Sequence, residues 1–226
     1  MLTSAIHHVR EHGSLLANPE RRLLIWIAHR LPRAINSDHL TLLALASMAL
    51  AGGAYAAARF TPYALWLVIV ALVLNWFGDS LDGTLARVRR VERPRYGFYV
   101  DHVLDIVGIS LLLGGLACSG YMSPLVAMVL LVTYLLVMAE VFLATAAHGI
   151  FRMSFLWFGP TELRIVLAVG TVALFDDPQV TLGSFGRFAL FDVGGVVAAF
   201  GLVVALLSAA IRNTRVLSRL EPARRI

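Results

Sequence analysis

Six long apolar runs recur along the 226-residue chain, and they constrain its fold more than any other feature. Hydrophobic residues make up 59% of the chain and charged residues 15%, whereas a soluble domain carries about a quarter charged residues. A helix needs about 20 apolar residues to cross a bilayer, and most of the runs approach that length. The sequence therefore predicts an all-α, polytopic membrane protein with six transmembrane helices, at 38–58, 62–86, 98–119, 122–147, 161–175 and 191–211.

The basic residues, 19 arginines and no lysine, predict which side of the membrane each loop faces. Cytoplasmic loops carry the excess of basic residues in membrane proteins. With six spans, 17 arginines fall on the side shared by both termini and the 87–97 loop, and only Arg59 and Arg187 fall on the other. Both termini are therefore expected in the cytoplasm. The arginines are expected to contact anionic headgroups of membrane lipids, and no nucleic-acid partner is expected.

The segment before the first span, "PERRLLIWIAHRLPRAI", is predicted to form an amphipathic helix in the cytoplasmic interface. Its apolar residues recur at helical spacing and its arginines are available for a polar face: Leu23, Leu24, Ile27 and Leu31 against Arg21, Arg22 and Arg30. No repeat or long linker divides the chain. We therefore expect one domain over 1–226, with an interfacial segment at 1–36, a six-helix core at 38–211 and a cytoplasmic tail at 212–226.

Four aspartates lie in two pairs, near the end of the second span and the start of the third. Asp79 and Asp82 are three residues apart, so they share one face of a helix. The same holds for Asp101 and Asp105, which are four residues apart. The basic turn between the pairs makes the two helices antiparallel, which allows all four carboxylates to converge near the cytoplasmic surface. An uncompensated aspartate inside a membrane costs about 2.5–3.5 kcal/mol, so four of them need an explanation.

Two explanations for these acids remain open. One is that each carboxylate is satisfied separately, by capping a helix or by pairing with an arginine. The other is that the four together bind two divalent cations, which would neutralise their charge. Carboxylate oxygens suit Mg²⁺, Mn²⁺ or Ca²⁺ rather than Zn²⁺. Two such ions about 4 Å apart form a clamp for phosphoryl chemistry.

Small residues adjoin the acidic pairs and have two interpretations of their own. Gly83 and Ala86 leave a groove beside Asp82, and Gly97 opens the next helix. Such residues either let helices pack closely or give a ligand access to the backbone. Arg87, one turn beyond Gly83, is able to reach a diphosphate oxygen.

Together these residues resemble the signature of the CDP-alcohol phosphotransferases, integral membrane enzymes that build phospholipids. All eight signature positions are filled: Asp79, Asp82, Gly83, Ala86, Arg87, Gly97, Asp101 and Asp105. The opening of the first span, "INSDHLTLLAL", is similar to the family's P-N-x-L-T start. There Ser37 and Asp38 replace the usual proline and asparagine, which leaves a ligand role for Asn36 or Thr41 open.

The resemblance implies transfer of a phospho-alcohol group from a CDP-linked donor to a hydroxyl of a lipid or small alcohol, with release of CMP. Three aspartates are expected to hold two Mg²⁺ or Mn²⁺ ions: Asp79, Asp82 and Asp101. Asp105 is expected to accept the hydroxyl proton and to touch the second metal. The donor is expected against four residues: Gly83, Ala86, Arg87 and Gly97. Family members are commonly dimers, so a homodimer is expected, in a bacterial inner membrane with the active site facing the cytoplasm.

The donor class stays open. Most bacterial members use CDP-diacylglycerol, whereas the choline and ethanolamine branch uses a CDP-amino alcohol. Partial resemblance to that branch rests on three residues: His102 after the third aspartate, Glu140, and Glu162 in "GPTE". His102 and Glu140 are candidate catalytic residues, and Glu162 is a candidate substrate-binding residue. Alternatively, Glu162 caps the fifth span and His102 is an ordinary interfacial histidine.

A small transporter or cation channel is the alternative function, because acids inside a membrane also mark ion pathways. Such a protein is expected to spread its acids through the depth of the membrane and to break its helices at the midplane. In this chain the acidic pairs cluster toward one surface, beside an arginine-rich loop. The sequence therefore favours an enzyme whose site is open to a cytosolic anion.

Overall fold

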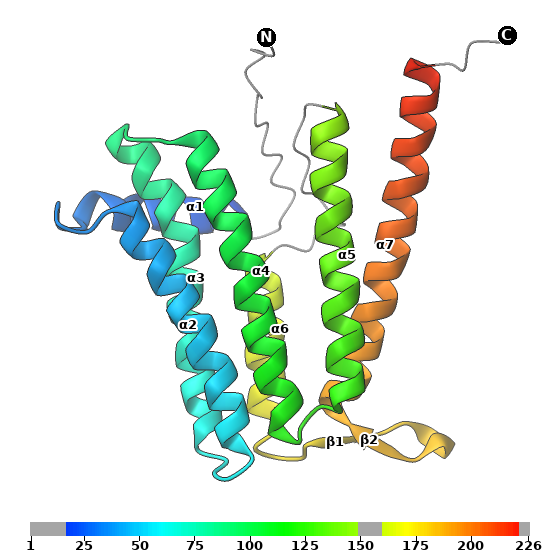
Figure 1. The fold of residues 1–226 in the computed structure, drawn as a ribbon. Coiled ribbons are helices and arrows are strands. Elements are labelled where there is room, and N and C mark those ends of the chain that lie inside the picture. Colours follow the sequence, from blue (N-terminus) through cyan, green and yellow to red (C-terminus); the bar gives the residue numbers. More distant parts are fainter. Residues whose placement is uncertain (1–16, 149–159, 222–226) are drawn as a thin grey trace, which may run out of the picture.

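The computed structural model describes residues 17–148 and 160–221, and helices dominate it (Figure 1). The helices are α1 (Ala17–Arg30), α2 (Ser37–Ala58), α3 (Ala64–Arg89), α4 (Pro94–Ser119), α5 (Pro124–His148), α6 (Pro160–Ala173) and α7 (Leu190–Leu220). Between α6 and α7 lie β1 (Gln179–Thr181), the 3₁₀ turn η1 (Gly183–Phe185) and β2 (Arg187–Ala189). The two strands pair antiparallel, with Val180 opposite Phe188.

Five of these helices, α2, α3, α4, α5 and α7, are long and apolar enough to cross a membrane. The predicted all-α membrane fold is thereby confirmed, with five of its six predicted spans. The predicted span 161–175 corresponds to α6, which has 14 residues. At 1.5 Å per residue it is about 21 Å long, shorter than a hydrocarbon core of about 30 Å. The predicted tail at 212–226 begins as a continuation of α7, which runs on to Leu220.

The helices form two groups that meet between α4 and α5. Figure 1 shows α2, α3 and α4 side by side, α5 beside α7, and α6 behind α4. The α3–α4 turn lies at the same end as the last turns of α7, whereas the α2–α3 turn and the β-hairpin lie at the opposite end. The carboxyl half of α3 and the amino half of α4 therefore share one end of the molecule.

Glycines bring the backbones of α2 and α4 into direct contact. A Cβ added at Gly115 would lie 1.9 Å from the carbonyl oxygen of Gly52, and one added at Gly52 would lie 2.2 Å from that of Leu111. No side chain fits at either position without moving a helix. Helix packing through small residues is the usual way for membrane helices to approach closely. This contact sets the position of α4 relative to α2.

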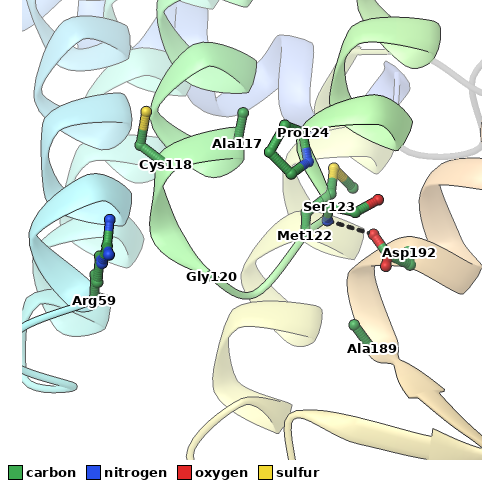
Figure 2. Close-up of a pocket in the computed structure, with 9 residues that line it drawn as sticks. All are labelled: Arg59, Ala117, Cys118, Gly120, Met122, Ser123, Pro124, Ala189 and Asp192. Carbon is green, nitrogen blue, oxygen red and sulfur yellow. Dashed lines mark hydrogen bonds between the residues drawn. The ribbon is translucent and has the colours of Figure 1, made fainter.

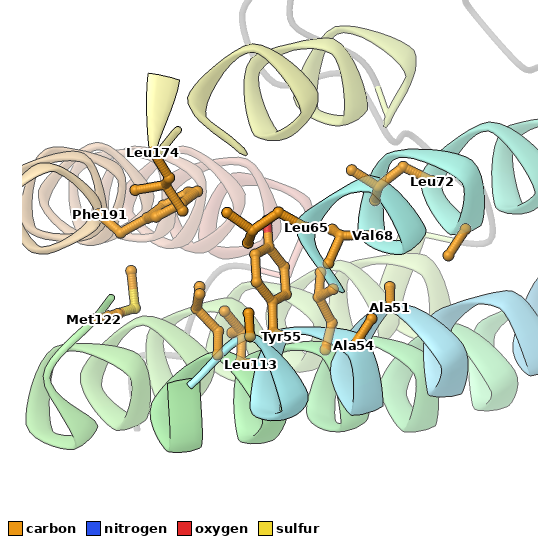
Figure 3. Close-up of a cluster of buried hydrophobic side chains, with 14 of the residues drawn as sticks. Ala51, Ala54, Tyr55, Leu65, Val68, Leu72, Leu113, Met122, Leu174 and Phe191 are labelled. Atoms are coloured by element: carbon orange, nitrogen blue, oxygen red, sulfur yellow. The ribbon is translucent and has the colours of Figure 1, made fainter. Parts of the chain in front are cut away.

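At the end away from the α3–α4 turn, a cluster of buried side chains joins α2, α3 and α4 to the start of α7 (Figure 3). Tyr55 lies at its centre and is fully buried. Its ring meets the ring of Phe191 edge-on, with centroids 6.0 Å apart. Its hydroxyl and that of Thr171 are 2.6 Å apart and share a hydrogen bond. The lower end of α6 is thus attached to α2.

The first helix, α1, crosses behind α2 and α3 rather than running along them (Figure 1). Its apolar face packs on those helices in a second buried cluster: Leu24, Ala28, Leu40, Leu81 and Leu85. The guanidinium of Arg89 donates to the carbonyl oxygens of Leu31 and Pro32, each at 3.0 Å. This amphipathic helix lies where the sequence predicts one. Residues 1–16 of the predicted interfacial segment lie outside the described residues.

Candidate active site

A tight turn brings the two acidic pairs to the same level of neighbouring helices. Arg90 ends α3 in the left-handed conformation, with φ of 57°, and its backbone N–H bonds the carbonyls of the last turn. Pro94 then starts α4, where its missing N–H costs nothing. Arg93 pairs with Asp38 at the start of α2, and this hydrogen bond raises the pKa of Arg93 above its ordinary value. The turn is therefore fixed at both ends, and α3 and α4 run antiparallel.

Three carboxylates meet between these helices. One oxygen each from Asp79, Asp101 and Asp105 lies within 4.8 Å of the others. Asp79 comes from α3 and the other two from successive turns of α4, so the group exists only because the turn aligns the helices. All three residues are half-buried. The structure thus brings together three of the four predicted metal-binding aspartates.

The fourth aspartate, Asp82, lies beside this group and is held by other contacts. Its Oδ2 accepts a hydrogen bond from Thr41 Oγ1 at 2.7 Å, and its Oδ1 accepts one from the backbone N–H of Gly83. It remains close enough to Asp79 and Asp101 to interact with them electrostatically. Thr41, whose role was open in the sequence, therefore orients Asp82 from α2.

Arg164 of α6 is a residue of this site that the sequence does not predict. Its Nη2 donates to Asp79 Oδ2 at 2.5 Å and its Nε donates to Asn75 Oδ1 at 2.7 Å. The ion pair is mostly shielded, since the two side chains are 15% and 22% exposed. Asn75 in turn donates to the carbonyl oxygen of Ala44 at 3.0 Å. Arg164 counts among the arginines of the cytoplasmic side, at the start of the predicted span 161–175, and the structure gives it an acidic partner, Asp79.

A further neighbour comes from α5. Tyr134 is close enough to Asp105 and Asp79 to interact with them electrostatically. The site is therefore bordered by α2, α3, α4, α5 and α6. Tyr134 lies in the long, mostly apolar run of α5, and nothing in its local sequence marks it as a neighbour of the acids.

Two of the small residues beside the acids, Gly83 and Gly97, have open space next to them. A Cβ added at Gly83 would meet only the flexible end of Arg87, at 3.4 Å, and one added at Gly97 would meet nothing within 4 Å. Neither glycine is therefore used for helix packing, unlike Gly52 and Gly115. Ala86 is half-buried on the same stretch of α3. Arg87 is exposed, and its Nη2 donates to Thr84 Oγ1 at 3.1 Å.

The three residues that resemble the choline and ethanolamine branch have separate surroundings. His102 is buried; its Nδ1 lies 2.7 Å from the carbonyl oxygen of Phe98, and its ring packs against Phe98 and Phe142. Glu140 Oε1 accepts a hydrogen bond from Asn213 Nδ2 of α7 at 2.6 Å. Glu162 is in the first turn of α6, and its side chain lies outside the described part of the structure. None of the contacts above joins His102 or Glu140 to the aspartates.

The three converging carboxylates fit a hard divalent cation. All the ligand atoms are charged oxygens, which suit Mg²⁺ or Mn²⁺. If all four aspartates are ionised, their four negative charges and the one positive charge of Arg164 leave a net excess of three negative charges within the site. Two divalent ions would turn that excess into one positive charge, which an anionic diphosphate ligand would offset.

A cavity of about 610 Å³ lies at the opposite end of the molecule (Figure 2). It is open to the surface between the end of α4, the start of α5 and the start of α7. Its polar lining includes Arg59 and Asp192, and Asp192 Oδ1 accepts a hydrogen bond from the backbone N–H of Ser123 at 2.6 Å. None of the four aspartates lines this cavity, so it is separate from the candidate active site.

Comparison with protein-family models gives a match over residues 35–211 to the family described as CDP-alcohol phosphatidyltransferase. The match covers most of the chain and includes every signature residue and Arg164. No curated protein matches the chain.

Proposed function

The chain belongs to the CDP-alcohol phosphatidyltransferase family, and we propose that it transfers a phospho-alcohol group from a CDP-linked donor to an acceptor hydroxyl, releasing CMP. The family acts in phospholipid synthesis. The donor is either CDP-diacylglycerol or a CDP-amino alcohol such as CDP-ethanolamine or CDP-choline. The acceptor is correspondingly a small polar alcohol or a lipid with a free hydroxyl.

The observation that carries this proposal is the convergence of Asp79, Asp101 and Asp105 within 4.8 Å. These residues occupy signature positions and come from two helices of the matched family region. Separate satisfaction of each acid would not require their oxygens to meet. The transporter or channel alternative has no support in the family match.

The four aspartates are the proposed ligands of two Mg²⁺ or Mn²⁺ ions. Asp79 and Asp101 are metal ligands, Asp82 is a ligand oriented by Thr41, and Asp105 serves as ligand and base. When bound, such ions neutralise charge on a diphosphate and hold it in line with the attacking oxygen.

The donor is proposed to lie along the open side of α3. Gly83 of α3 and Gly97 at the start of α4 offer space for it, because neither is in contact with another helix. Ala86 extends this surface by one turn, and the exposed guanidinium of Arg87 pairs with the donor's diphosphate. These features support access for a ligand rather than close helix packing at this point.

In the reaction, Asp105 takes the proton from the acceptor hydroxyl, as a carboxylate within hydrogen-bond reach is able to do. The hydroxyl oxygen forms a bond to the β-phosphorus of the donor. The bond between that phosphorus and the oxygen bridging to the α-phosphate breaks. CMP leaves with this oxygen and its electron pair, and the phospho-alcohol is now joined to the acceptor.

The donor class depends on residues outside the aspartate group. A CDP-amino alcohol carries an ammonium, which Glu140 or Glu162 would be suited to bind, and His102 would assist the reaction. The buried ring contacts of His102 and the Glu140–Asn213 hydrogen bond also suit purely structural roles. Both donor classes therefore belong in the test.

The experiment is CMP release by the purified protein from a panel of donors, with Mg²⁺ or Mn²⁺ and with matched acceptors. CDP-diacylglycerol is paired with small polar alcohols, and CDP-ethanolamine and CDP-choline with diacylglycerol. We expect metal-dependent CMP from one donor class, abolished by chelation. Absence of CMP with every pair would overturn the proposed function.

We also expect a homodimer in the bacterial inner membrane, with the aspartates at the cytoplasmic side. The face of α7 around Gly194 and Gly201 supports pairing of two copies, because an added Cβ there would meet nothing within 4 Å. Val197 and Phe200 beside them are 66% and 71% exposed. The mass of the detergent-solubilised protein tests this expectation.

A further inference from the structure

Glu20 of α1 joins three helices through one carboxylate oxygen. Its Oε1 accepts a hydrogen bond from Trp76 Nε1 at 2.7 Å and one from Ser80 Oγ at 3.3 Å, both on α3. The same oxygen accepts a hydrogen bond from Thr161 Oγ1 at 2.9 Å, in the first turn of α6. One acidic side chain therefore links the helix that carries Asp79 to the beginning of the helix that carries Arg164.

The two polar anchors of α6 lie on the same side of that helix. Thr161 and Arg164 are three residues apart, so both side chains face α3. On α3 their partners form adjacent rows. Asn75 and Asp79, four residues apart, accept hydrogen bonds from Arg164. Trp76 and Ser80, also four residues apart, donate hydrogen bonds to Glu20. Thr161 donates to the same Glu20 oxygen. The Glu20–Thr161 contact thus sets the height and rotation of α6 at which Arg164 reaches Asp79.

The remaining attachment of α6 described above is far from the site. Thr171 shares a hydrogen bond with Tyr55 near the other end of the helix. Without the Thr161–Glu20 bond, the polar contacts between the start of α6 and α3 described here would be those of Arg164 with Asp79 and Asn75. A single flexible guanidinium defines the position of a helix less well than two separate anchors do.

We propose that Glu20 and Thr161 form a latch that positions α6, so that Arg164 meets Asp79 in the geometry the transfer reaction requires. Glu20 and Thr161 are positioning residues, because their hydrogen bonds are to each other and to Trp76 and Ser80 rather than to the aspartates. The helix α1 then has a role in the reaction beyond attachment to the membrane surface. This inference rests on the proposed function for its effect on turnover.

The test combines a distance measurement with CMP release. Spin labels at Val73 of α3 and Val169 of α6, both exposed, report the spacing of these helices by pulsed electron resonance in a Cys118→Ala background. Thr161→Val removes the hydroxyl and keeps the size of the side chain. We expect it to broaden the distance distribution and to lower CMP release about fivefold, as loss of one hydrogen bond implies.

Glu20→Ala is expected to have the larger effect, because three donors lose their acceptor. Glu20→Gln keeps an oxygen in place and is expected to restore both readouts. The double variant Glu20→Ala/Thr161→Val is expected to be no worse than Glu20→Ala, since both changes remove the same bond. Thr145→Val is the matched control, because the Thr145 hydroxyl bonds only a carbonyl of its own helix, Val141, at 2.7 Å.

Three results would overturn the latch. The first is a Thr161→Val variant that matches Thr145→Val in both the distance distribution and CMP release. The second is a double variant whose loss equals the sum of the Glu20→Ala and Thr161→Val losses. The third is a broadened distance distribution with unchanged CMP release. If Thr161→Val fails to fold, Glu20→Ala reports on the same bond. If the wild-type protein releases no CMP from any donor, the proposed function fails, while the distance measurement still decides whether the latch holds α6.

Discussion

At the scale of single residues, the four aspartates differ in the groups that contact their carboxylates. Asp82 is held by Thr41 and a backbone N–H, and Asp79 is shared between Arg164 and the other carboxylates. Asp105 has two acidic neighbours, Asp79 and Asp101, in the converging group. These differences allow the four aspartates, which look equivalent in the sequence, to have different roles.

Asp105→Asn is expected to lower CMP release by a factor of at least about 100, the usual contribution of a general base. The amide keeps the size of the side chain and removes its ability to take a proton. Turnover is measured with the donor class identified in the panel. Asp177→Asn is the control, since Asp177 is an exposed acid that pairs with Arg187 of the β-hairpin. Near-normal turnover in Asp105→Asn would contradict the base assignment.

Arg164→Ala is expected to bind Mn²⁺ several-fold more tightly while releasing CMP more slowly. The guanidinium lies 2.5 Å from Asp79 and competes with any cation for that carboxylate. Its loss also removes a positive charge and an orienting contact from the site. Free Mn²⁺ is measured by electron resonance during titration of the purified protein. Arg187→Ala is the control, and equal or weaker Mn²⁺ binding by Arg164→Ala would exclude this competition.

At the scale of helices, glycines have two uses that their sequence context does not distinguish. Gly52 and Gly115 bring α2 and α4 into backbone contact, whereas Gly83 and Gly97 leave space beside the acids. The first use holds the helices together. The second leaves a helix surface open to a ligand. Only the neighbours of each glycine in space decide between them.

Gly115→Ala is expected to destabilise the folded protein by about 1–3 kcal/mol, as overpacking does, because its Cβ would lie 1.9 Å from the Gly52 carbonyl oxygen. Gly114→Ala is the matched control on the same helix, since nothing lies within 4 Å of its Cβ. Thermal unfolding in detergent measures both. A Gly115→Ala variant as stable as Gly114→Ala would show that α2 and α4 separate at no cost.

At the scale of the whole molecule, the two ends differ in chemistry. One end carries the α3–α4 turn with its arginines and the aspartates below it (Figure 1). The other carries the β-hairpin and the cavity near Arg59 (Figures 1 and 2). The excess of arginine at the first end predicts that it faces the cytoplasm.

Cysteine labelling tests this orientation in a Cys118→Ala background. Glu92→Cys in the α3–α4 turn is expected to react with an impermeant maleimide only after the membrane is opened. Ser184→Cys in η1, which is exposed, is expected to react in intact cells. The two positions control for each other. The reverse pattern would place the active site on the outer side.

Sequence patterns are enough to predict the helical membrane architecture and the place of the acidic pairs. Apolar length decides which segments suit a bilayer, and fixed helical spacing decides which aspartates share a face, so both follow from local rules. Five of the six predicted spans correspond to described helices long and apolar enough to cross a membrane, and the sixth, 161–175, corresponds to the 14 described residues of α6.

The surroundings of the acids depend on how the helices pack against one another. Arg164 is 85 residues from Asp79, Thr41 is 41 residues from Asp82, and Thr161 is 141 residues from Glu20. No periodicity or spacing connects such pairs, because each contact depends on how whole helices pack. The same reason applies to Gly83 and Gly115, since a glycine's neighbours belong to other segments of the chain.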